Sequence, residues 1–96
     1  MREITVSDVI EATGGELKYG DENSVIKGVF YDSREVKEDY LFVPIIGARV
    51  DAHKFIPDVL NAGASCVLSS DPDITIDKGA LVLVDDTILA MQKLAL

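Results

Sequence analysis

The sequence predicts an α/β domain, a small mixed β-sheet with helices packed on it that contains one β-α-β unit. Short apolar runs rich in β-branched residues recur along the chain, and glycine, proline or polar residues bound each run, as is typical of strands. Between two such runs, residues 54–62 carry apolar side chains at helical spacing. Pro57 fits this helix only in its first turn. A helix that joins two strands of one sheet predicts that the strands are parallel and that their crossover connection is right-handed.

The first third of the chain predicts a strand, a helix and two further strands. Ser7 is the expected N-cap of the helix, because its hydroxyl can accept from amides of the first turn. Gly14 is expected to end the helix in the left-handed conformation. The two strands after the helix are expected to pair locally. The three strands are predicted at residues 4–6, 16–19 and 25–30.

The remaining two thirds supply the predicted β-α-β unit and a last helix. Residues 31–40 are polar and without period, which predicts a loop. Residues 41–46 form a nearly continuous apolar run, typical of a strand buried on both faces. Pro44 indicates an edge, a bulge or the end of that strand. Further strands are predicted at 64–68 and 81–84, and the last helix follows the cap Asp85-Asp86-Thr87.

Composition limits the classes of function. A chain of 96 residues, 48% of them hydrophobic, suits one packed domain. The formal net charge of −8 argues against nucleic acid and against an anionic membrane surface, because both partners need a basic face. No apolar stretch approaches the length of a leader or a membrane span, so a cytoplasmic location is expected.

Catalytic and metal-binding patterns are not found in the sequence. One cysteine and one histidine cannot form an intrachain disulfide or a standard zinc site. No P-loop pattern is present, so the chain has no visible means of handling ATP. Cys66 lies in an apolar run and is expected to be a core residue. His53 is expected to be structural, with Asp51 as a helix cap. An autonomous hydrolase or transferase is therefore the least favoured class.

The segment Asp32-Ser33-Arg34 combines groups that suit an anion. The guanidinium of Arg34 presents a planar set of donors, and the hydroxyl of Ser33 can add another. The alternative is a surface turn in which Asp32 pairs with Arg34. The chemistry of the residues favours neither interpretation. Arg49 lies in the loop that leaves the apolar strand, where α/β sheets often place ligands, so two loops around one strand can converge on one pocket.

The chain carries an ordered set of motifs, which are Asp32-Ser33-Arg34, Leu41-Phe42-Val43, Gly47, Asp51-Ala52-His53, Phe55-Ile56 and Gly63-Ala64. This set resembles the N-terminal domain of the Mur ligases. These enzymes build the peptide of bacterial peptidoglycan on a UDP-linked muramic acid. The opening Ser7–Gly15 is most similar to the MurF type, which adds D-alanyl-D-alanine to the UDP-muramoyl tripeptide. The resemblance extends over nearly the whole chain.

The resemblance implies that residues 1–96 form a single domain, the N-terminal UDP-substrate-binding domain of a larger ligase. The UDP-N-acetylmuramoyl-peptide would be its ligand. A central domain with ATP and Mg, and a C-terminal domain, would be its partners in the same polypeptide. This chain would need no cofactor and carry no catalytic residue. The amphipathic pattern still running at Leu96 also predicts a fragment of a longer chain.

The resemblance also implies site residues. Substrate contacts fall on Tyr31, Ser33, Arg34, Ala48, Arg49 and Val50, and supporting roles fall on Asp32, Gly47, Asp51 and His53. Two alternatives stay open: the same domain of a MurE-type ligase, and a stand-alone protein-interaction module without nucleotide binding.

Overall fold

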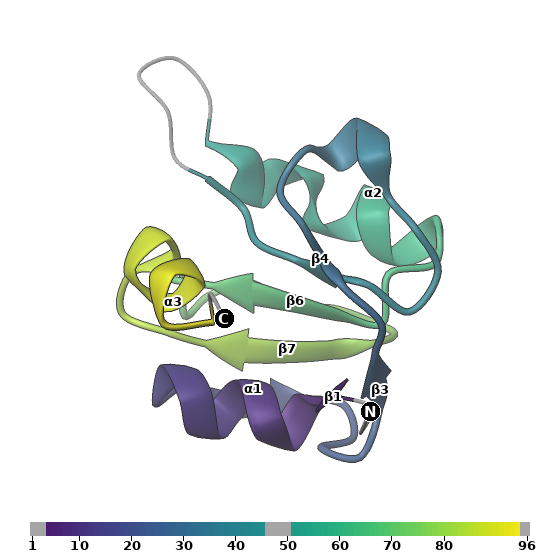
Figure 1. Cartoon of the computed structure of the whole chain (residues 1–96). Coiled ribbons are helices and arrows are strands. Elements are labelled where there is room, and N and C mark those ends of the chain that lie inside the picture. The colour runs from purple at the N-terminus through teal and green to yellow at the C-terminus, as the bar shows by residue number, and fades with distance from the viewer. Residues whose placement is uncertain (1–3, 46–50, 95–96) are drawn as a thin grey trace.

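The computed structural model describes residues 4–45 and 51–94 as an α/β fold (Figure 1). Its elements, in chain order, are β1 (Ile4–Thr5), α1 (Val6–Thr13), β2 (Glu16–Tyr19), β3 (Val25–Ile26), β4 (Val29–Phe30), η1 (Ser33–Glu35), β5 (Leu41–Phe42), η2 (Ala52–Phe55), α2 (Ile56–Asn61), β6 (Cys66–Ser69), β7 (Ala80–Leu83) and α3 (Thr87–Leu94). The elements η1 and η2 are short 3-10 helices.

The main sheet of the described residues has the strand order β2-β7-β6-β5-β4. Strands β4 to β7 run parallel to their neighbours, and β2 pairs antiparallel with β7. Strands β1 and β3 form a separate antiparallel ribbon. Because α2 connects the parallel strands β5 and β6, the predicted β-α-β unit and the predicted mixed sheet are both confirmed.

Two predictions about the strands after α1 are wrong. The segment 25–30, predicted as one strand, forms β3 and β4, which belong to different sheets. Lys27 and Gly28 separate the two strands, and at Gly28 the ring of Tyr40 lies so close that a Cβ would be 2.5 Å from it. The expected local pairing of residues 16–19 is also absent, because β2 pairs with β7 from the far end of the chain.

The strand predicted at residues 41–46 is shorter than expected. Its regular part, β5, ends at Phe42, although the amide of Val43 still donates to the carbonyl of Phe30 at 2.9 Å. Pro44 has no N–H to continue the ladder, so the pairing stops there. The interruption expected from this proline is therefore the end of the strand.

The helix ends agree with the sequence in part. Thr5, not the predicted Ser7, caps α1: its hydroxyl accepts from the amide of Asp8, whose carboxylate in turn accepts from the amide of Thr5. Gly14 ends α1 in the left-handed conformation, as predicted. Pro57 lies in the first turn of α2, where a missing N–H costs no hydrogen bond.

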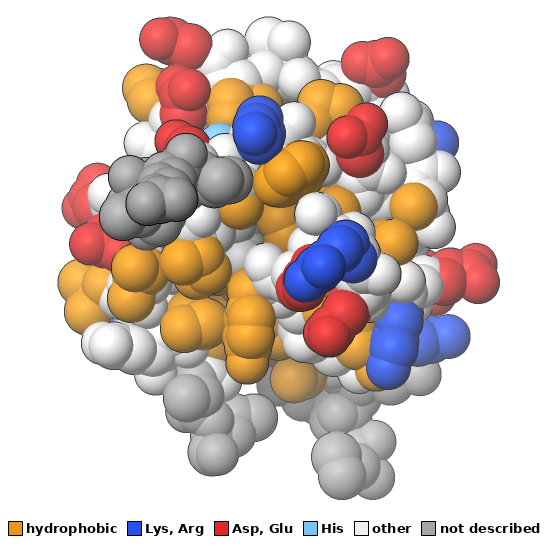
Figure 2. All heavy atoms as spheres, turned by 90° about the horizontal axis from the view of Figure 1, so that it is seen from above, with side chains coloured by type: hydrophobic (Ala, Val, Ile, Leu, Met, Phe, Trp, Pro, Cys, Tyr) orange, Lys and Arg blue, Asp and Glu red, His pale blue; other side chains and the backbone are white. Residues whose placement is uncertain are grey.

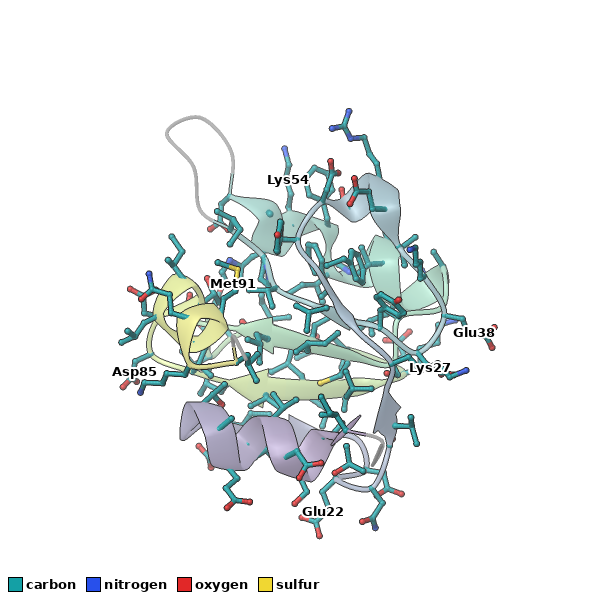
Figure 3. The ribbon with its side chains drawn as sticks, viewed as in Figure 1. Glu22, Lys27, Glu38, Lys54, Asp85 and Met91 are labelled. Atoms are coloured by element: carbon teal, nitrogen blue, oxygen red, sulfur yellow. The ribbon has the colours of Figure 1, made fainter. Side chains whose placement is uncertain are left out.

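Buried apolar side chains of the described residues form two clusters, one on each face of the main sheet. Leu41 and Phe42 are adjacent in β5 yet belong to different clusters, because successive strand side chains alternate between faces. One face is covered by α1 and α3, which lie side by side, and Met91 points from α3 toward the strands (Figure 3). The other face is covered by α2. The result is three layers.

The connections between the parallel strands all pass over the α2 face. Val36 and Tyr40 from the first connection, and Ile74 and Ile76 from the last, pack against the same cluster as α2. Strands β4, β5, β6 and β7 therefore succeed one another across the sheet without a reversal of direction. Their carboxyl ends all open on one edge.

Candidate functional site

The carboxyl edge of the main sheet holds those described residues that the sequence singles out. We use this name for described residues that follow β4, β5 and β6, which are residues 31–36, 43–45 with 51–54, and 70–73. The three strands are neighbours, with Phe30 beside Phe42 and Phe42 beside Val67. Ligands of open α/β sheets bind outside the carboxyl ends of the strands, so this edge is where a site is expected.

Asp32 and Arg34 form the surface turn that was one of the two interpretations of this segment. The carboxylate of Asp32 caps η1 by accepting from the amide of Arg34 at 2.9 Å. It also accepts from the guanidinium in a two-pronged pair, with distances of 3.1 Å and 2.8 Å. These bonds lower the pKa of Asp32 to about 2. The exposed guanidinium of Arg34 is thus already paired with the carboxylate of Asp32.

Tyr31 and Ser33 present groups that nothing else in the described residues uses. The side chain of Tyr31 is 57% exposed, which is unusual for an aromatic ring. Ser33 is half-buried at the start of η1, and its hydroxyl makes no hydrogen bond within residues 4–45 and 51–94. Figure 2 shows hydrophobic side chains in the middle of one face with charged groups around them. A ring surface and a free hydroxyl two residues apart suit a ligand with both a planar and an anionic part.

The loop after β5 is pinned to the loop after β6 through His53. Its side chain is 7% exposed. The ring Nδ1 lies 2.6 Å from the carboxylate of Asp51, and the ring Nε2 accepts from the amide of Ser70 at 3.0 Å. Asp51 also caps η2 by accepting from the amide of His53 at 2.9 Å, and this bond leads the causes that lower the pKa of its carboxyl. The expected cap at Asp51 is therefore present.

Aspartate, histidine and serine here have the connectivity of a catalytic triad, but the Nε2 lone pair that would take the serine proton is already occupied. The hydroxyl of Ser70 lies 3.3 Å from Nε2 of His53. An amide N–H can only donate, so the amide of Ser70 occupies the Nε2 lone pair and the ring proton is on Nδ1, facing Asp51. A general base needs that lone pair free. The arrangement therefore joins two loops and does not activate the hydroxyl. Sequence reasoning missed Ser70, because only the fold brings it to His53.

Gly47, Ala48, Arg49 and Val50 lie outside the described residues. The carbonyl of Ile45, before them in the chain, accepts from the amide of Ala52, after them, at 3.1 Å.

Lys54 is a second residue that the sequence did not single out. It projects from η2 on the same side of the molecule as η1, with its ammonium 5.2 Å from the centre of the Phe55 ring (Figure 3). It adds a cation to the carboxyl edge. Its position directly after the motif Asp51-Ala52-His53 is the sequence feature that could have indicated it.

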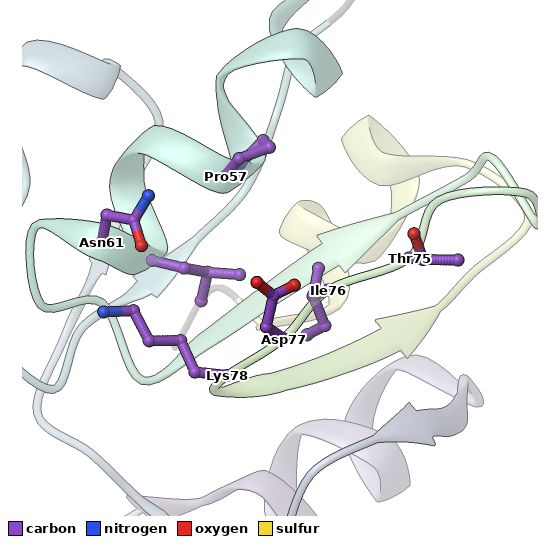
Figure 4. A pocket seen from close by; sticks show the side chains of 7 residues that line it. Pro57, Asn61, Thr75, Ile76, Asp77 and Lys78 are labelled. Carbon is purple, nitrogen blue, oxygen red and sulfur yellow. The ribbon is translucent and has the colours of Figure 1, made fainter.

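A pocket of about 330 Å³ lies elsewhere, between α2 and the segment that leads to β7 (Figure 4). Pro57 and Asn61 line it from the helix, and Thr75 to Lys78 line it from the segment. It contains none of the predicted site residues.

The expectation for Cys66 can be checked in the described part of the chain. Cys66 is fully buried in β6, and burial raises the pKa of its thiol to about 12, so it is the core residue that was predicted. Residues 4–45 and 51–94 bring together no three His, Cys, Asp or Glu side chains placed to hold a metal ion. None of the helices in these ranges combines the length and apolarity needed to cross a bilayer.

Fold and site together define an α/β domain with its polar groups at the carboxyl ends of parallel strands. Residues 25–95 match the family described as "Mur ligase family, catalytic domain", which is more than half of the chain. The chain belongs to the Mur ligase family, as its motifs indicated.

Individual relatives of two types are similar to the chain. The UDP-N-acetylmuramoyl-tripeptide–D-alanyl-D-alanine ligase of Bacillus subtilis is 38% identical over 94 residues, which are 95% of this chain and 20% of that enzyme. A UDP-N-acetylmuramoyl-L-alanyl-D-glutamate–2,6-diaminopimelate ligase of Caldanaerobacter subterraneus is 38% identical over 89 residues, 92% of this chain and 18% of that enzyme. A crystal structure of MurF from Acinetobacter baumannii matches with a TM-score of 0.84 at 28% identity, over 98% of this chain and 20% of that one. The chain thus spans about a fifth of the length of these relatives.

Proposed function

We propose that this chain is the domain that docks the UDP-N-acetylmuramoyl-peptide substrate of a peptidoglycan-precursor ligase of the MurF type. The observation that carries the proposal is the pairing of an exposed Tyr31 ring with the free Ser33 hydroxyl at the carboxyl edge. The names of relatives from two ligase types include a UDP-N-acetylmuramoyl substrate, which supports a ligand of this class.

In this proposal, Tyr31 and Ser33 make the main contacts with the ligand. The Ser33 hydroxyl donates to the diphosphate, and the Tyr31 ring packs on the uracil, since flat bases stack on aromatic side chains. Arg34, Asp32, Asp51 and His53 shape the loops, because each is already engaged within the chain. Arg49, Ala48 and Val50 complete the nucleotide contacts in this proposal. The net charge of −8 opposes a dianion, so local donors must provide the affinity.

The reaction itself is assigned to other parts of a longer polypeptide. In that protein, ATP and Mg serve a central domain, a C-terminal domain receives the dipeptide, and the whole acts in the cytoplasm. The matched family description contains the word catalytic. We nevertheless assign docking to this chain, because the one histidine that meets a serine here has its lone pair occupied by an amide.

The MurE-type ligases are the second candidate, because one of them is as similar to this chain as the MurF-type ligase of Bacillus subtilis, at 38% identity. The two types differ in the peptide on the substrate. Comparing affinities for the UDP-muramoyl dipeptide and tripeptide in the longer polypeptide distinguishes them: preference for the tripeptide supports MurF, and preference for the dipeptide supports MurE.

A titration of the isotope-labelled chain with UDP-N-acetylmuramoyl tripeptide tests the docking role. Amide signals of Tyr31 to Arg34 and of residues 48–50 should shift on binding at millimolar ligand, and those of Glu22, on the far side of the molecule in Figure 3, should not. Ser33→Ala should weaken binding because it removes a donor without changing the η1 cap. Unchanged signals at 31–34 and 48–50 would support the stand-alone interaction module instead.

A further inference from the structure

We propose that Ser70 is a further ligand contact at the carboxyl edge, that His53 positions it, and that it binds the sugar portion of the substrate. This inference rests on the proposed docking function and extends the site to the loop after β6. Neither the motifs nor the sequence pattern around residues 69–73 pointed to this loop.

The backbone of Ser70 is fixed at the edge by two elements. Ser69, the last residue of β6, is fully buried and lies beside Leu83 in the ladder with β7. The next amide, that of Ser70, donates to Nε2 of His53 at 3.0 Å. His53 is in turn held by Asp51 at the base of the loop after β5. Ser70 is therefore held beside His53, at the carboxyl ends of β5 and β6.

The hydroxyls of the two neighbouring serines differ in what they can still bind. The Ser69 hydroxyl donates to the carbonyl of Asp71 and accepts from its amide, both at 3.0 Å, so its bonds close within the loop. The Ser70 hydroxyl has only Nε2 of His53 within reach in the described residues, at 3.3 Å. That nitrogen has one lone pair, and the amide already uses it at a shorter distance. The half-buried Ser70 hydroxyl thus keeps its proton for another acceptor.

Charge decides which part of the ligand Ser70 meets. The charge of Arg34 next to Ser33 is balanced by its partner Asp32, whereas Asp71 follows Ser70, and Asp73 lies two residues further with its amide bonded to the Asp71 carboxylate. A diphosphate is repelled at the second position, while uncharged hydroxyl and amide groups of a sugar are not. The loops after β4 and β6 are two strand spacings apart, about 10 Å. This span fits a nucleoside diphosphate at Ser33 with its attached sugar reaching toward Ser70.

The test compares two probes, UDP and UDP-N-acetylmuramoyl tripeptide, on variants of the whole chain. Ser70→Ala removes the hydroxyl and leaves the amide bond to His53 in place. It should weaken binding of the UDP-muramoyl tripeptide about three- to tenfold, the range of one hydrogen bond, and leave UDP binding unchanged. Ser33→Ala should weaken both probes.

Ser65→Ala is the matched control. Ser65 lies just before β6, at the end of this strand opposite to the carboxyl edge, and its hydroxyl donates to the carbonyl of Val25. Its loss should lower stability without changing the affinity for either probe.

The positioning role of His53 has its own comparison. His53→Gln can keep an acceptor for the Ser70 amide, and His53→Ala cannot. For folded protein at equal concentration, Gln should retain more affinity for the UDP-muramoyl tripeptide than Ala, whereas UDP affinity should change less. Equal affinity of these two variants would refute the positioning role.

The remaining outcomes separate the inference from the proposed function. Full tripeptide affinity in Ser70→Ala with weakened binding in Ser33→Ala overturns the Ser70 contact and leaves docking intact. Equal weakening of both probes by Ser70→Ala overturns the assignment to the sugar. Absence of binding of either probe to the unaltered chain removes the docking function, and the Ser70 contact with it.

Discussion

The replacement His53→Ala should destabilise the fold more than any exposed change at the carboxyl edge. The ring is buried at 7% exposure and bonds to two partners. Its removal leaves the amide of Ser70 without an acceptor, which lowers the free energy of unfolding by about 1–3 kcal/mol. The lost side-chain volume lowers it further. The bond to Asp51 contributes less, because that carboxylate is 57% exposed to water.

Together these losses amount to about 2–4 kcal/mol. For a domain of this size each kcal/mol lowers the melting temperature by about 4–8 °C, so a decrease of about 8–30 °C is expected. Urea unfolding followed by circular dichroism gives the free energy of unfolding. The rate of hydrogen exchange at the Ser70 amide shows directly whether that amide has lost its acceptor.

Two further variants isolate the cause. His53→Gln can accept from the Ser70 amide and should recover about 1 kcal/mol of the loss. Lys54→Ala, the exposed neighbour in η2, should stay within about 0.5 kcal/mol of the unaltered chain. If His53→Ala unfolds at the same urea concentration as Lys54→Ala, the bridge between the two loops contributes nothing and the reasoning is wrong.

Three other predictions concern stability and ionisation. Gly14→Ala should lower the free energy of unfolding by about 1 kcal/mol, since Gly14 has a φ of 71° but open space around it. Gly15→Ala should lower it by about 2–3 kcal/mol, because the new Cβ would lie 2.9 Å from a carbonyl oxygen of β7. Urea unfolding measures both losses, and equal losses would contradict the distinction. Cys66 should resist a thiol reagent at pH 8 until the chain is unfolded; rapid labelling of folded protein would contradict its burial. The Asp32 pKa of about 2 lies below its ordinary 3.8, so its stabilising contribution is present above pH 3.8 and lost as pH falls through about 2. Arg34→Ala should raise this pKa, measured by carboxyl NMR, and an unchanged value would show that the guanidinium pair is not its cause.

The sequence predicts the local elements of this fold better than their partners. Short apolar runs bounded by polar residues mark β6 and β7, and Gly14 marks the end of α1, because these signals depend on neighbouring residues. The division of residues 25–30 between two sheets depends on pairing partners elsewhere in the chain, with β1 for β3 and with β5 for β4. The pairing of β2 with β7 spans most of the chain, so no local pattern encodes it.

The candidate site shows the same division. Asp32 and Arg34 lie two residues apart, and the sequence already allowed the paired turn that they form. The sequence also indicated Asp51 as a cap, which η2 shows. Ser70 contacts His53 from seventeen positions away, through a strand pairing, so it could not be predicted without the fold.

The uninterrupted succession of β4, β5, β6 and β7 has a consequence for ligand residence. Sheets whose strand order reverses form a crevice between helices that encloses a ligand. This sheet has no reversal within its described parallel strands, and their connections share one face. As far as residues 4–45 and 51–94 are concerned, a ligand at the carboxyl edge would therefore lie on an open surface, with no enclosing crevice between helices. Exchange with the isolated chain should be fast, and a long residence time would require a second surface to close over the first.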